Sequence, residues 1–379
     1  MRVGLNAGFL GQQGTGSGQY ARHLLGAAAE ADPSVQYLPF ARIADAGYAA
    51  SSLRPLVTPF AHRSANLDKL WFEQVSFPQA CRQAEADVCH VPYFAPPLLS
   101  WVPVVVTIHD LIPLLLPAYR GSLWVRAYMR LVSAAARRAD QIITDSKASK
   151  EDIVGRLRIP AERVHVVYLG VDPAYRPVHD DMLLAAVRAR YGLPARYILY
   201  LGGFDQRKNL SVLMRAYQRV LYTLGERAPG LVVAGRPPAV DTRLFPDPKR
   251  IAKELGIERN VVFTGWVDEA DKPALYSTAL FLAFLSHYEG FGLIPLEAMA
   301  CGLPVLASQS SSLPEVVGDG GTLVDPTQLD AVSEAMLLLI RDAGLRQALS
   351  EAALAQAARF DWGKTARETL RVYSLAAAK

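Results

Sequence analysis

Residues 279–308 read ALFLAFLSHYEGFGLIPLEAMACGLPVLAS, a pattern that predicts a β-strand, a loop, an α-helix and a second β-strand. The run ALFLAFLS is apolar throughout, which is typical of a strand buried on both faces. Pro295 fits the first residue of a helix, where its missing N–H costs nothing. Gly302 and Pro304 then end the helix before PVLAS begins the next strand. This order predicts two parallel strands joined by a helical crossover.

The same alternation of apolar strands and helical stretches continues along the whole chain. The predicted strands are RVGLNAG, VQYLPF, DVCHV, VPVVVTI, QIITD and VHVVYLG in the first half, and YILYLG, LVVAG, NVVFTG, ALFLAFLS and PVLAS in the second. Apolar strands separated by helices indicate parallel sheets covered on both faces. Because the pattern occurs twice, we expect an α/β fold of two Rossmann-like, doubly wound domains. They would face each other across a cleft, where a ligand would bind.

The chain has 379 residues, which is too long for one hydrophobic core of ordinary size and suits two domains. Residues 170–181 contain two prolines and no apolar period, as expected for a linker. We therefore expect one domain over residues 1–172 and another over residues 173–379. The last stretch, from about residue 360 to residue 379, is helical again and could pack back on the first domain.

Composition excludes several classes of protein. The formal net charge of +4 is far below that of a typical nucleic-acid-binding domain. Cys81, Cys89 and Cys301 are too few and too scattered for a disulfide framework or a zinc site, and we interpret them as buried thiols. No apolar run reaches the length of a membrane span, and the N-terminus resembles a strand rather than a signal peptide. We expect a cytoplasmic protein.

Two glutamates, Glu289 and Glu297, flank the loop between the quoted strand and helix. Gly290 and Gly292 would let the backbone approach a ligand closely. Free N–H groups at the helix start favour phosphate, so the carboxylates would flank a phosphate-sized site. A glutamate in a first helical turn is commonly only a dipole or capping partner, worth about 0.3–1 kcal/mol. That alternative stays open for Glu297.

A second candidate site lies in LGGFDQRKNLSVLMRAY, which predicts a strand, a loop and a helix with Asn209 as N-cap. Arg207 and Lys208 would then lie at the helix N-terminus, where cations oppose the helix dipole. A bound anion would reverse that penalty, and a guanidinium beside an ammonium suits a diphosphate. The alternative is a solvated pair of charges at a loop tip.

In the first half, His109 and Asp110 follow a buried strand. His109 could hydrogen-bond a substrate hydroxyl, although a structural histidine is the alternative. Gly16, Gly18 and Ala21 have the spacing of the dinucleotide fingerprint, but they do not follow their strand immediately. We interpret this loop as a flexible, phosphate- or acceptor-facing segment that leads into the helix QYARHLLGAAAE.

Residues 119–140 predict a helix that is both basic and aromatic. Its apolar and aromatic residues include Trp124, Tyr128 and Leu131. Five arginines lie beside them: Arg120, Arg126, Arg130, Arg137 and Arg138. Such a helix could rest on an anionic membrane and admit a lipid-linked acceptor. A merely solvated helix face is the alternative.

Together these stretches resemble the family four retaining glycosyltransferases of the GT-B fold, also called group 1 glycosyltransferases. The similar stretches are EGFGLIPLEAMACGLPVLAS, VVFTGWVDE, HDLIP, TDSKASKEDI, RKNL and PEVVGDGGTLVDP. The similarity covers essentially the whole chain, and the glutamate pair matches the family motif E-x7-E. It implies transfer of a hexose from a nucleotide diphosphate sugar to a glycan or lipid-linked acceptor in cell-surface polysaccharide or glycolipid synthesis. The N-terminal domain would bind the acceptor and the C-terminal domain the donor.

The resemblance implies catalytic roles for four residues. Arg207 and Lys208 would neutralise the diphosphate leaving group, Glu289 would contact the donor sugar, and His109 would bind the transferred sugar near its reacting carbon. The sequence has no Asp-x-Asp pair for a divalent ion, so we expect neither metal nor cofactor. The protein cations would stabilise the leaving group instead.

The resemblance also implies a donor-binding set, in which Glu297 would bind the nucleotide ribose. The expected set is Gly16, Gly18, Gly203, Trp266, Val267, Gly290, Phe291, Gly292, Leu293 and Glu297. Many family members carry an arginine where this chain has Gly203, and here Arg207 would supply that charge from a different backbone position.

The favoured donor is GDP-mannose, and nucleic acid is not an expected partner. Two other functions stay open, a nucleotide-sugar epimerase on a similar scaffold and a non-catalytic nucleotide-sugar binding protein. A dehydrogenase is disfavoured because the glycine loop does not fit the fingerprint.

Overall fold

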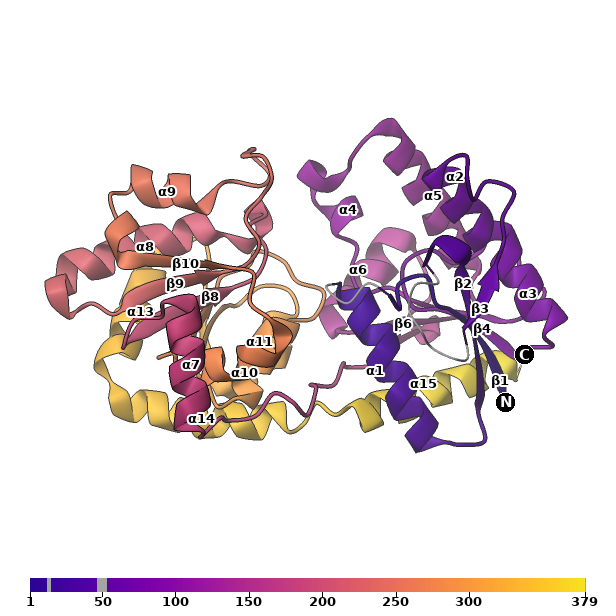
Figure 1. Cartoon of the computed structure of the whole chain (residues 1–379). Helices are drawn as coiled ribbons and strands as arrows, with labels where there is room; N and C mark the ends of the chain where they lie inside the picture. Colours follow the sequence, from indigo (N-terminus) through magenta and orange to yellow (C-terminus); the bar gives the residue numbers. More distant parts are fainter. Residues whose placement is uncertain (12–14, 46–52, 379) are drawn as a thin grey trace. The chain divides into compact units, whose positions relative to one another are not determined.

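The computed structural model describes residues 1–11, 15–45 and 53–378 (Figure 1). The chain divides into an N-terminal unit, Met1–Gly170 with Asp361–Lys379, and a C-terminal unit, Val171–Phe360. Each unit contains one sheet whose paired strands are all parallel, with helices packed on it. The prediction of two doubly wound α/β sheets is therefore confirmed.

The sheet of the N-terminal unit has the strand order β3-β2-β1-β4-β5-β6-β7. Its strands are β1 (Arg2–Asn6), β2 (Gln36–Arg42), β3 (Arg54–Leu56), β4 (Val88–Val91), β5 (Val104–Thr107), β6 (Gln141–Thr144) and β7 (Val164–Val166). The order changes direction between β1 and β4, so the carboxyl ends of these two strands form a crevice in which α/β sheets bind ligands.

Helices cover both faces of this sheet, because alternate residues of its strands enter different cores. The helices are α1 (Gly16–Ala31), α2 (Ala65–Trp71), α3 (Phe77–Gln83), α4 (Ile112–Leu115), α5 (Leu123–Arg138), α6 (Lys147–Leu157) and α15 (Trp362–Ala377). On β5, Val104 and Val106 pack with residues of α3, α5 and α6, whereas Val105 packs with α15. This alternation follows from the two-residue period of a strand.

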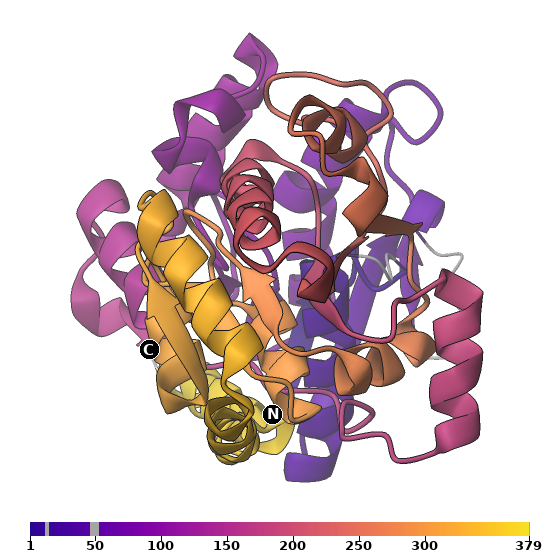
Figure 2. The same cartoon turned by 90° about the vertical axis from the view of Figure 1, so that its left-hand side faces the viewer.

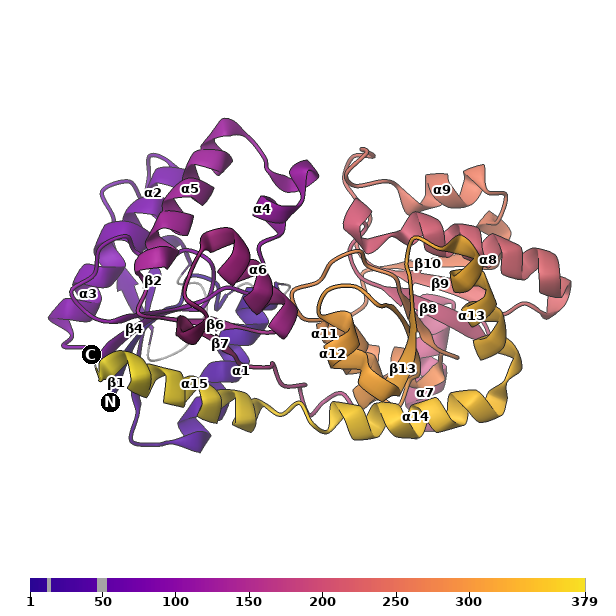
Figure 3. The same ribbon diagram turned by 180° about the vertical axis from the view of Figure 1, so that it is seen from behind.

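The C-terminal helix α15 belongs to the N-terminal unit, where it lies against α1 (Figure 3). The hydroxyl of Tyr373 lies 2.7 Å from Nδ1 of the buried His90, and the Thr365 hydroxyl donates to the Tyr168 carbonyl at 2.7 Å. The backbone of Trp362 packs closely on Gly170, where an added Cβ would lie 2.3 Å from the Trp362 nitrogen. Buried polar contacts therefore hold this helix on the sheet.

The sheet of the C-terminal unit has the order β10-β9-β8-β11-β12-β13. Its strands are β8 (Tyr197–Leu201), β9 (Gly230–Ala234), β10 (Val261–Gly265), β11 (Leu282–Phe284), β12 (Val305–Ser308) and β13 (Gly321–Val324). Its helices are α7 (Asp181–Tyr191), α8 (Leu210–Leu224), α9 (Pro248–Glu254), α10 (Lys272–Thr278), α11 (Leu293–Ala300), α12 (Leu313–Val317), α13 (Leu329–Arg341) and α14 (Ala343–Ala357). α8 and α13 pack side by side (Figure 2) and share one core, whereas α11 and α12 pack on β11 and β12.

Three predicted helix boundaries are wrong. The helix expected over 119–140 begins only at Leu123, because Gly121 has a positive φ of 62° and Ser122 caps the first turn. The helix expected to begin after Gly18 begins at Gly16, and the helix expected to begin at Pro295 begins at Leu293. Glu297 therefore lies in the second turn of α11, so the proposed dipole role of a first-turn glutamate does not apply.

The three cysteines are free and buried, as interpreted from the sequence. Within the part of the chain that the structure describes, no helix is both long and apolar enough to cross a membrane.

Candidate functional site

The C-terminal unit places its charged loops where the strand order of its sheet changes direction. β8 and β11 are neighbours, but β8 leads through α8 to β9 on one side and β11 leads through α11 to β12 on the other. Because such crossovers are right-handed, α8 and α11 cover opposite faces, which leaves a crevice at the carboxyl ends of β8 and β11. The loops 202–209 and 285–292 form the two sides of this crevice.

Side chains from both loops converge on one carboxylate oxygen. Oε1 of Glu289 lies 2.7 Å from Nζ of Lys208 and 2.8 Å from Nη1 of Arg207. Nε of Arg207 lies 3.3 Å from Oδ1 of Asp205. Lys208 also lies over the ring of Phe284, 4.9 Å from its centroid. The structure thus brings together three of the four predicted catalytic residues.

Backbone hydrogen bonds hold the two loops in register. The His287 N–H donates to the Arg207 carbonyl at 2.8 Å, and Arg207 donates through Nη1 to the Tyr288 carbonyl at 2.5 Å. The Glu289 N–H donates to Oγ of Ser311 at 2.8 Å. These bonds fix the carboxylate and the guanidinium relative to each other before any ligand binds.

The buried hydroxyl of Ser312 fixes the rest of the glutamate loop. It contacts the carbonyl oxygens of Phe291 at 2.5 Å and Glu289 at 2.9 Å. Ser312 lies outside every motif identified in the sequence, although it precedes α12 in the same crevice. The one sequence feature that could have indicated Ser312 is its position shortly after the predicted strand PVLAS.

The cations lower the pKa of Glu289. Burial is the largest single influence and would raise this pKa, but the charges of Lys208 and Arg207 outweigh it, so the pKa lies below its usual value. The side chain is 12% exposed. Glu289 is therefore a carboxylate at neutral pH.

Arg207 and Lys208 lie directly before α8, at the predicted helix N-terminus, and the carboxylates of the protein itself already oppose their charge. Glu289 and Asp205 pair with them, so two cations face two anions. Asn209 precedes α8 in the left-handed conformation, with φ of 57°, and its side chain makes no capping hydrogen bond. Its amide donates instead to the Pro326 carbonyl at 2.9 Å. A diphosphate at this site must compete with carboxylates for the cations.

The start of α11 presents backbone N–H groups at the same crevice. Gly292 has φ of 124°, a conformation that favours glycine, and an added Cβ would lie 3.0 Å from Leu313. In the first helical turn, the N–H groups of Leu293 and Ile294 have no acceptor within the helix, and Pro295 has no N–H. This arrangement, which includes Gly290 and Phe291 on the approach to the helix, suits a phosphate oxygen.

Glu297 does not join the cluster around Glu289. It is 6% exposed on α11 and accepts a hydrogen bond from the Tyr276 hydroxyl of α10 at 3.0 Å. Burial raises its pKa to about 7, although Lys272 and Tyr276 counteract the shift. The motif therefore contains two carboxylates with opposite pKa shifts.

The remaining predicted donor residues of this unit lie at the same edge of the sheet. Gly203 follows β8, and its carbonyl accepts a hydrogen bond from the Tyr200 hydroxyl. Trp266, which follows β10, is 47% exposed, whereas Val267 is buried. The guanidinium of Arg236, which follows β9, lies 5.3 Å from the Trp266 ring centroid. Arg236 was not predicted, although it follows the predicted strand LVVAG.

His109 lies in the N-terminal unit and has partners at both ring nitrogens. Nδ1 lies 2.6 Å from Oδ2 of Asp145, and Nε2 lies 3.3 Å from the Pro92 carbonyl. Burial would lower its pKa, but the charge and hydrogen bond of Asp145 raise it overall. Asp110 accepts from the Ile112 N–H at 2.9 Å at the start of α4. To bind His109, a substrate hydroxyl would have to replace the Pro92 carbonyl at Nε2, because this is the longer of the two contacts.

Gly16 and Gly18 lie in the first turn of α1 in the N-terminal unit, rather than in a loop. Thr15 caps this helix by accepting from the Gly18 N–H at 3.2 Å. The preceding residues 12–14 of the glycine-rich stretch lie outside the described residues. The structure therefore places these two glycines in a different unit from the cluster around Glu289.

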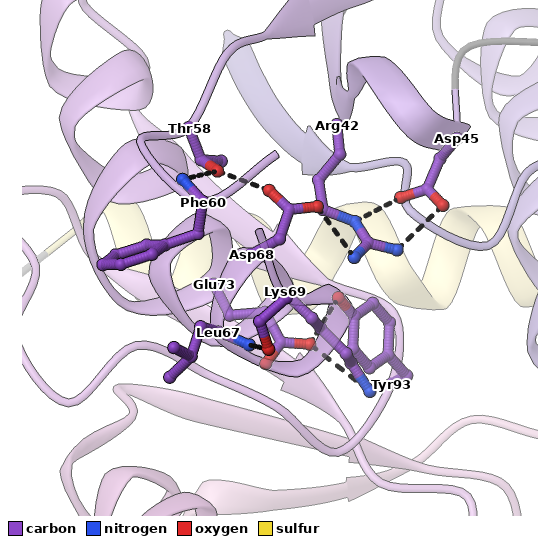
Figure 4. A network of polar contacts seen from close by, with 10 residues as sticks. Arg42, Asp45, Thr58, Phe60, Leu67, Asp68, Lys69, Glu73 and Tyr93 are labelled. Carbon is purple, nitrogen blue, oxygen red and sulfur yellow. Dashed lines mark hydrogen bonds and ion pairs between the residues drawn. The ribbon is translucent and has the colours of Figure 1, made fainter. Parts of the chain in front are cut away.

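A polar network that sequence reasoning missed lies at the carboxyl ends of β1, β2 and β4 (Figure 4). Arg42 holds Asp45 through two hydrogen bonds of 2.6 and 2.9 Å, and it reaches Asp68 at 3.2 Å. The Thr58 hydroxyl also donates to Asp68. Arg42 ends β2, two residues after the predicted strand VQYLPF, and a charged residue just after that strand was the available signal.

The network continues around Glu73, which is fully buried. Its carboxylate accepts from the hydroxyls of Tyr93 at 3.0 Å and Tyr128 at 2.8 Å, and Lys69 lies 3.8 Å away. The ring of Phe9 packs edge-on against Tyr93, with 4.6 Å between centroids. A cavity of about 100 Å³ borders Phe9, Lys69 and Tyr93. Charged and aromatic groups thus line the crevice of the first sheet.

Two family profiles match the chain, one in each half. The profile described as "Glycosyltransferase Family 4" matches residues 14–175, and that described as "Glycosyl transferases group 1" matches residues 188–356.

Individual proteins agree with these matches. O-antigen chain mannosyltransferase B of Escherichia coli is 34% identical over 272 residues, which are 72% of this chain and 70% of that protein. Among solved structures, sucrose-phosphate synthase from Thermosynechococcus elongatus has a TM-score of 0.77 at 22% identity over 100% of both chains. Anabaena HepE, in complex with UDP, has a TM-score of 0.75 at 19% identity over 98% of this chain and 99% of that one. The fold is thus that of GT-B glycosyltransferases, and the chain belongs to the family four, or group 1, glycosyltransferases.

Proposed function

We propose that this glycosyltransferase moves a hexose, with mannose favoured, from a nucleoside diphosphate sugar to a glycan or lipid-linked acceptor, with retention of configuration. The observation that carries the proposal is the convergence of Arg207 and Lys208 on Glu289 at the crevice of the second sheet. Cations from one loop and a carboxylate from the other suit a substrate that combines a diphosphate with a sugar.

Donor binding would exchange the partners of the two cations. The diphosphate carries more charge than one carboxylate, so it can take over Arg207 and Lys208 from Glu289. As the bond to the sugar breaks, negative charge grows on the leaving oxygen and the cations stabilise it. Glu289 would then contact the sugar, where positive charge develops. We propose that these cations replace a divalent metal ion in that role.

The start of α11 would complete the donor site. The N–H groups of Leu293 and Ile294 would hold a phosphate oxygen, and Glu297, four residues after Leu293, would accept from the ribose hydroxyls. Trp266 and Val267 would lie near the base. GDP-mannose is our favoured donor because a relative is a mannosyltransferase. A structural neighbour was solved in complex with UDP, so guanine and uracil nucleotides should both be tested.

The N-terminal unit would bind the acceptor. His109, the Arg42 network and the first turn of α1 with Gly16 and Gly18 supply polar groups for sugar hydroxyls. α5 exposes 81% of Leu123 and 46% of Trp124 beside its arginines, which supports peripheral contact with an anionic membrane. We propose that the enzyme acts in the cytoplasm at such a surface.

A panel of nucleotides tests the proposal. UDP, GDP and ADP are compared by thermal shift, because a ligand that binds the folded state raises the apparent stability. Sugar nucleotides of the best base are then tested for transfer to mannosides, with and without EDTA. Lys208→Ala should abolish the thermal shift, and the exposed Lys253→Ala on α9 should not.

The outcomes separate the proposal from its rivals. Transfer that needs an acceptor and survives EDTA supports it. A shift with no transfer and no hydrolysis indicates a non-catalytic binding protein, and conversion of the sugar without an acceptor indicates an epimerase. A shift that is equal in Lys208→Ala and wild type refutes the assigned donor site.

A further inference from the structure

A cavity of about 590 Å³ in the N-terminal unit lies between α5, the segment before it and the end of α6. Half of its ten lining residues are arginines, and none of the lining residues is Asp or Glu. The arginines are Arg120, Arg126, Arg130, Arg137 and Arg156. The cavity is therefore strongly positive.

Three separate segments supply these charges. Arg126, Arg130 and Arg137 repeat along one face of α5, together with the buried Ser133, at the helical spacing of three or four residues. Arg120 comes from the segment that precedes α5, and Arg156 from the last turn of α6. The fold thus gathers arginines that lie up to 36 positions apart in the sequence.

None of the five arginines forms an ion pair with an Asp or Glu within the described ranges 1–11, 15–45 and 53–378. Arg137 is oriented by the backbone, since its Nε donates to the Leu157 carbonyl at 2.8 Å. Some exposed arginines elsewhere in the chain pair with carboxylates, as Arg250 does with Asp241 at 2.5 Å. Clustered like charges repel one another, so this arrangement favours a bound anion.

We propose that this cavity binds a diphosphate or a comparable phosphorylated group, either free in solution or carried by a lipid. Guanidinium forks match phosphate oxygens in bidentate geometry, and more than one phosphate is needed to offset five positive charges. The exposed Leu123 and Trp124 at the start of α5 adjoin the arginines and suit a lipid-borne group. No residue of the proposed catalytic or donor-binding set lines the cavity. A lipid-borne ligand rests on the membrane contact of α5 proposed above, whereas a soluble ligand goes beyond it.

Calorimetric titration with inorganic pyrophosphate tests the site. Because pyrophosphate could also bind Arg207 and Lys208, all titrations use the Arg207→Ala/Lys208→Ala background at fixed salt. Adding Arg126→Gln/Arg130→Gln should weaken binding at least tenfold. Adding Arg138→Gln/Arg158→Gln, which removes the same charge from residues outside the cavity, should change it less than twofold. Circular dichroism and melting temperature verify that each variant is folded.

A second arm identifies the source of the phosphate. The same variants are floated with vesicles of phosphatidylcholine, alone or mixed with phosphatidic acid. Binding of pyrophosphate supports a soluble ligand, and binding only to phosphatidic acid vesicles supports a lipid headgroup, provided Arg126→Gln/Arg130→Gln abolishes it. Absence of binding in both arms overturns the proposal, as does an equal loss in the two double variants, which would indicate diffuse surface charge.

Discussion

Nζ of Lys208 lies 2.7 Å from Oε1 of Glu289, although 81 positions separate the two residues. The contact exists because β8 and β11 are neighbours in a sheet whose crossovers leave in opposite directions. Each residue follows its strand by five to seven positions, so two loops of similar length meet over the crevice. The pairing keeps two cations and a carboxylate close together without a ligand.

Replacement of Glu289 should separate binding from transfer. In Glu289→Gln the cations keep a neutral partner, so a nucleoside diphosphate no longer competes with a carboxylate and should bind at least as tightly as to wild type. Transfer should fall at least tenfold, because the charge that faces the sugar is lost. Calorimetry with the preferred nucleotide and initial rates with its sugar measure the two effects. Unchanged turnover would contradict a role of Glu289 at the sugar.

Ser312 should matter for the shape of the glutamate loop. Ser312→Ala removes the hydroxyl that contacts the Glu289 and Phe291 carbonyls in a buried site, and it should cost about 1 kcal/mol of stability. The looser loop should raise KM for the donor more than it lowers kcat. Thermal melts and donor titrations provide the measurements. The neighbouring Ser310→Ala serves as a control, and an equal effect of both changes would argue against a specific role.

The sequence predicted the interior strands of both sheets and one edge strand of each, β7 and β10, but it missed the strand at the opposite edge. All eleven predicted strands form, and the two that were missed, Arg54–Leu56 and Gly321–Val324, each lie at a sheet edge. The two missed strands are short and only partly buried, so they lack the continuous apolar run that identifies the other strands. The start of α11 was misplaced because Pro295 suggested a first helical residue, whereas Gly292 begins the turn through its positive φ.

The sequence predicted where the residues of the candidate site lie along the chain, but not which of them contact one another. Residues after strand ends could be named from the sequence, because parallel strands carry their loops to one edge. Whether Glu289 meets Lys208 depends on strand order, which hydrophobic patterns do not encode. The Arg42 network was missed because its members are scattered from Arg42 to Tyr128 and share no spacing. A contact of this kind requires the tertiary structure.

The buried Glu297 should make stability depend on pH. Its folded pKa of about 7 lies above the value of about 4.3 expected in the unfolded chain, so the folded state binds more protons between these values. Stability is therefore lost as the pH rises through this window, by roughly 4 kcal/mol once Glu297 is ionised. Glu297→Gln avoids the loss, so it should melt above wild type at pH 8 and close to it at pH 4.5. The exposed Glu258→Gln is the control, and a pH-independent difference for Glu297→Gln would refute the prediction.

Asp145 should set the protonation state of His109. The folded pKa of His109 is raised by Asp145, so this pair stabilises the fold fully below the unfolded histidine pKa of about 6.5 and loses that effect as the pH rises through the folded value. In Asp145→Asn burial dominates, and the pKa of His109 should fall below its usual value. The melting temperature should therefore drop more at pH 6 than at pH 9, by an amount equivalent to about 2 kcal/mol at the lower pH. NMR titration of the His109 ring, assigned with His109→Gln, measures the pKa directly, and an unshifted titration would show that Asp145 does not control it.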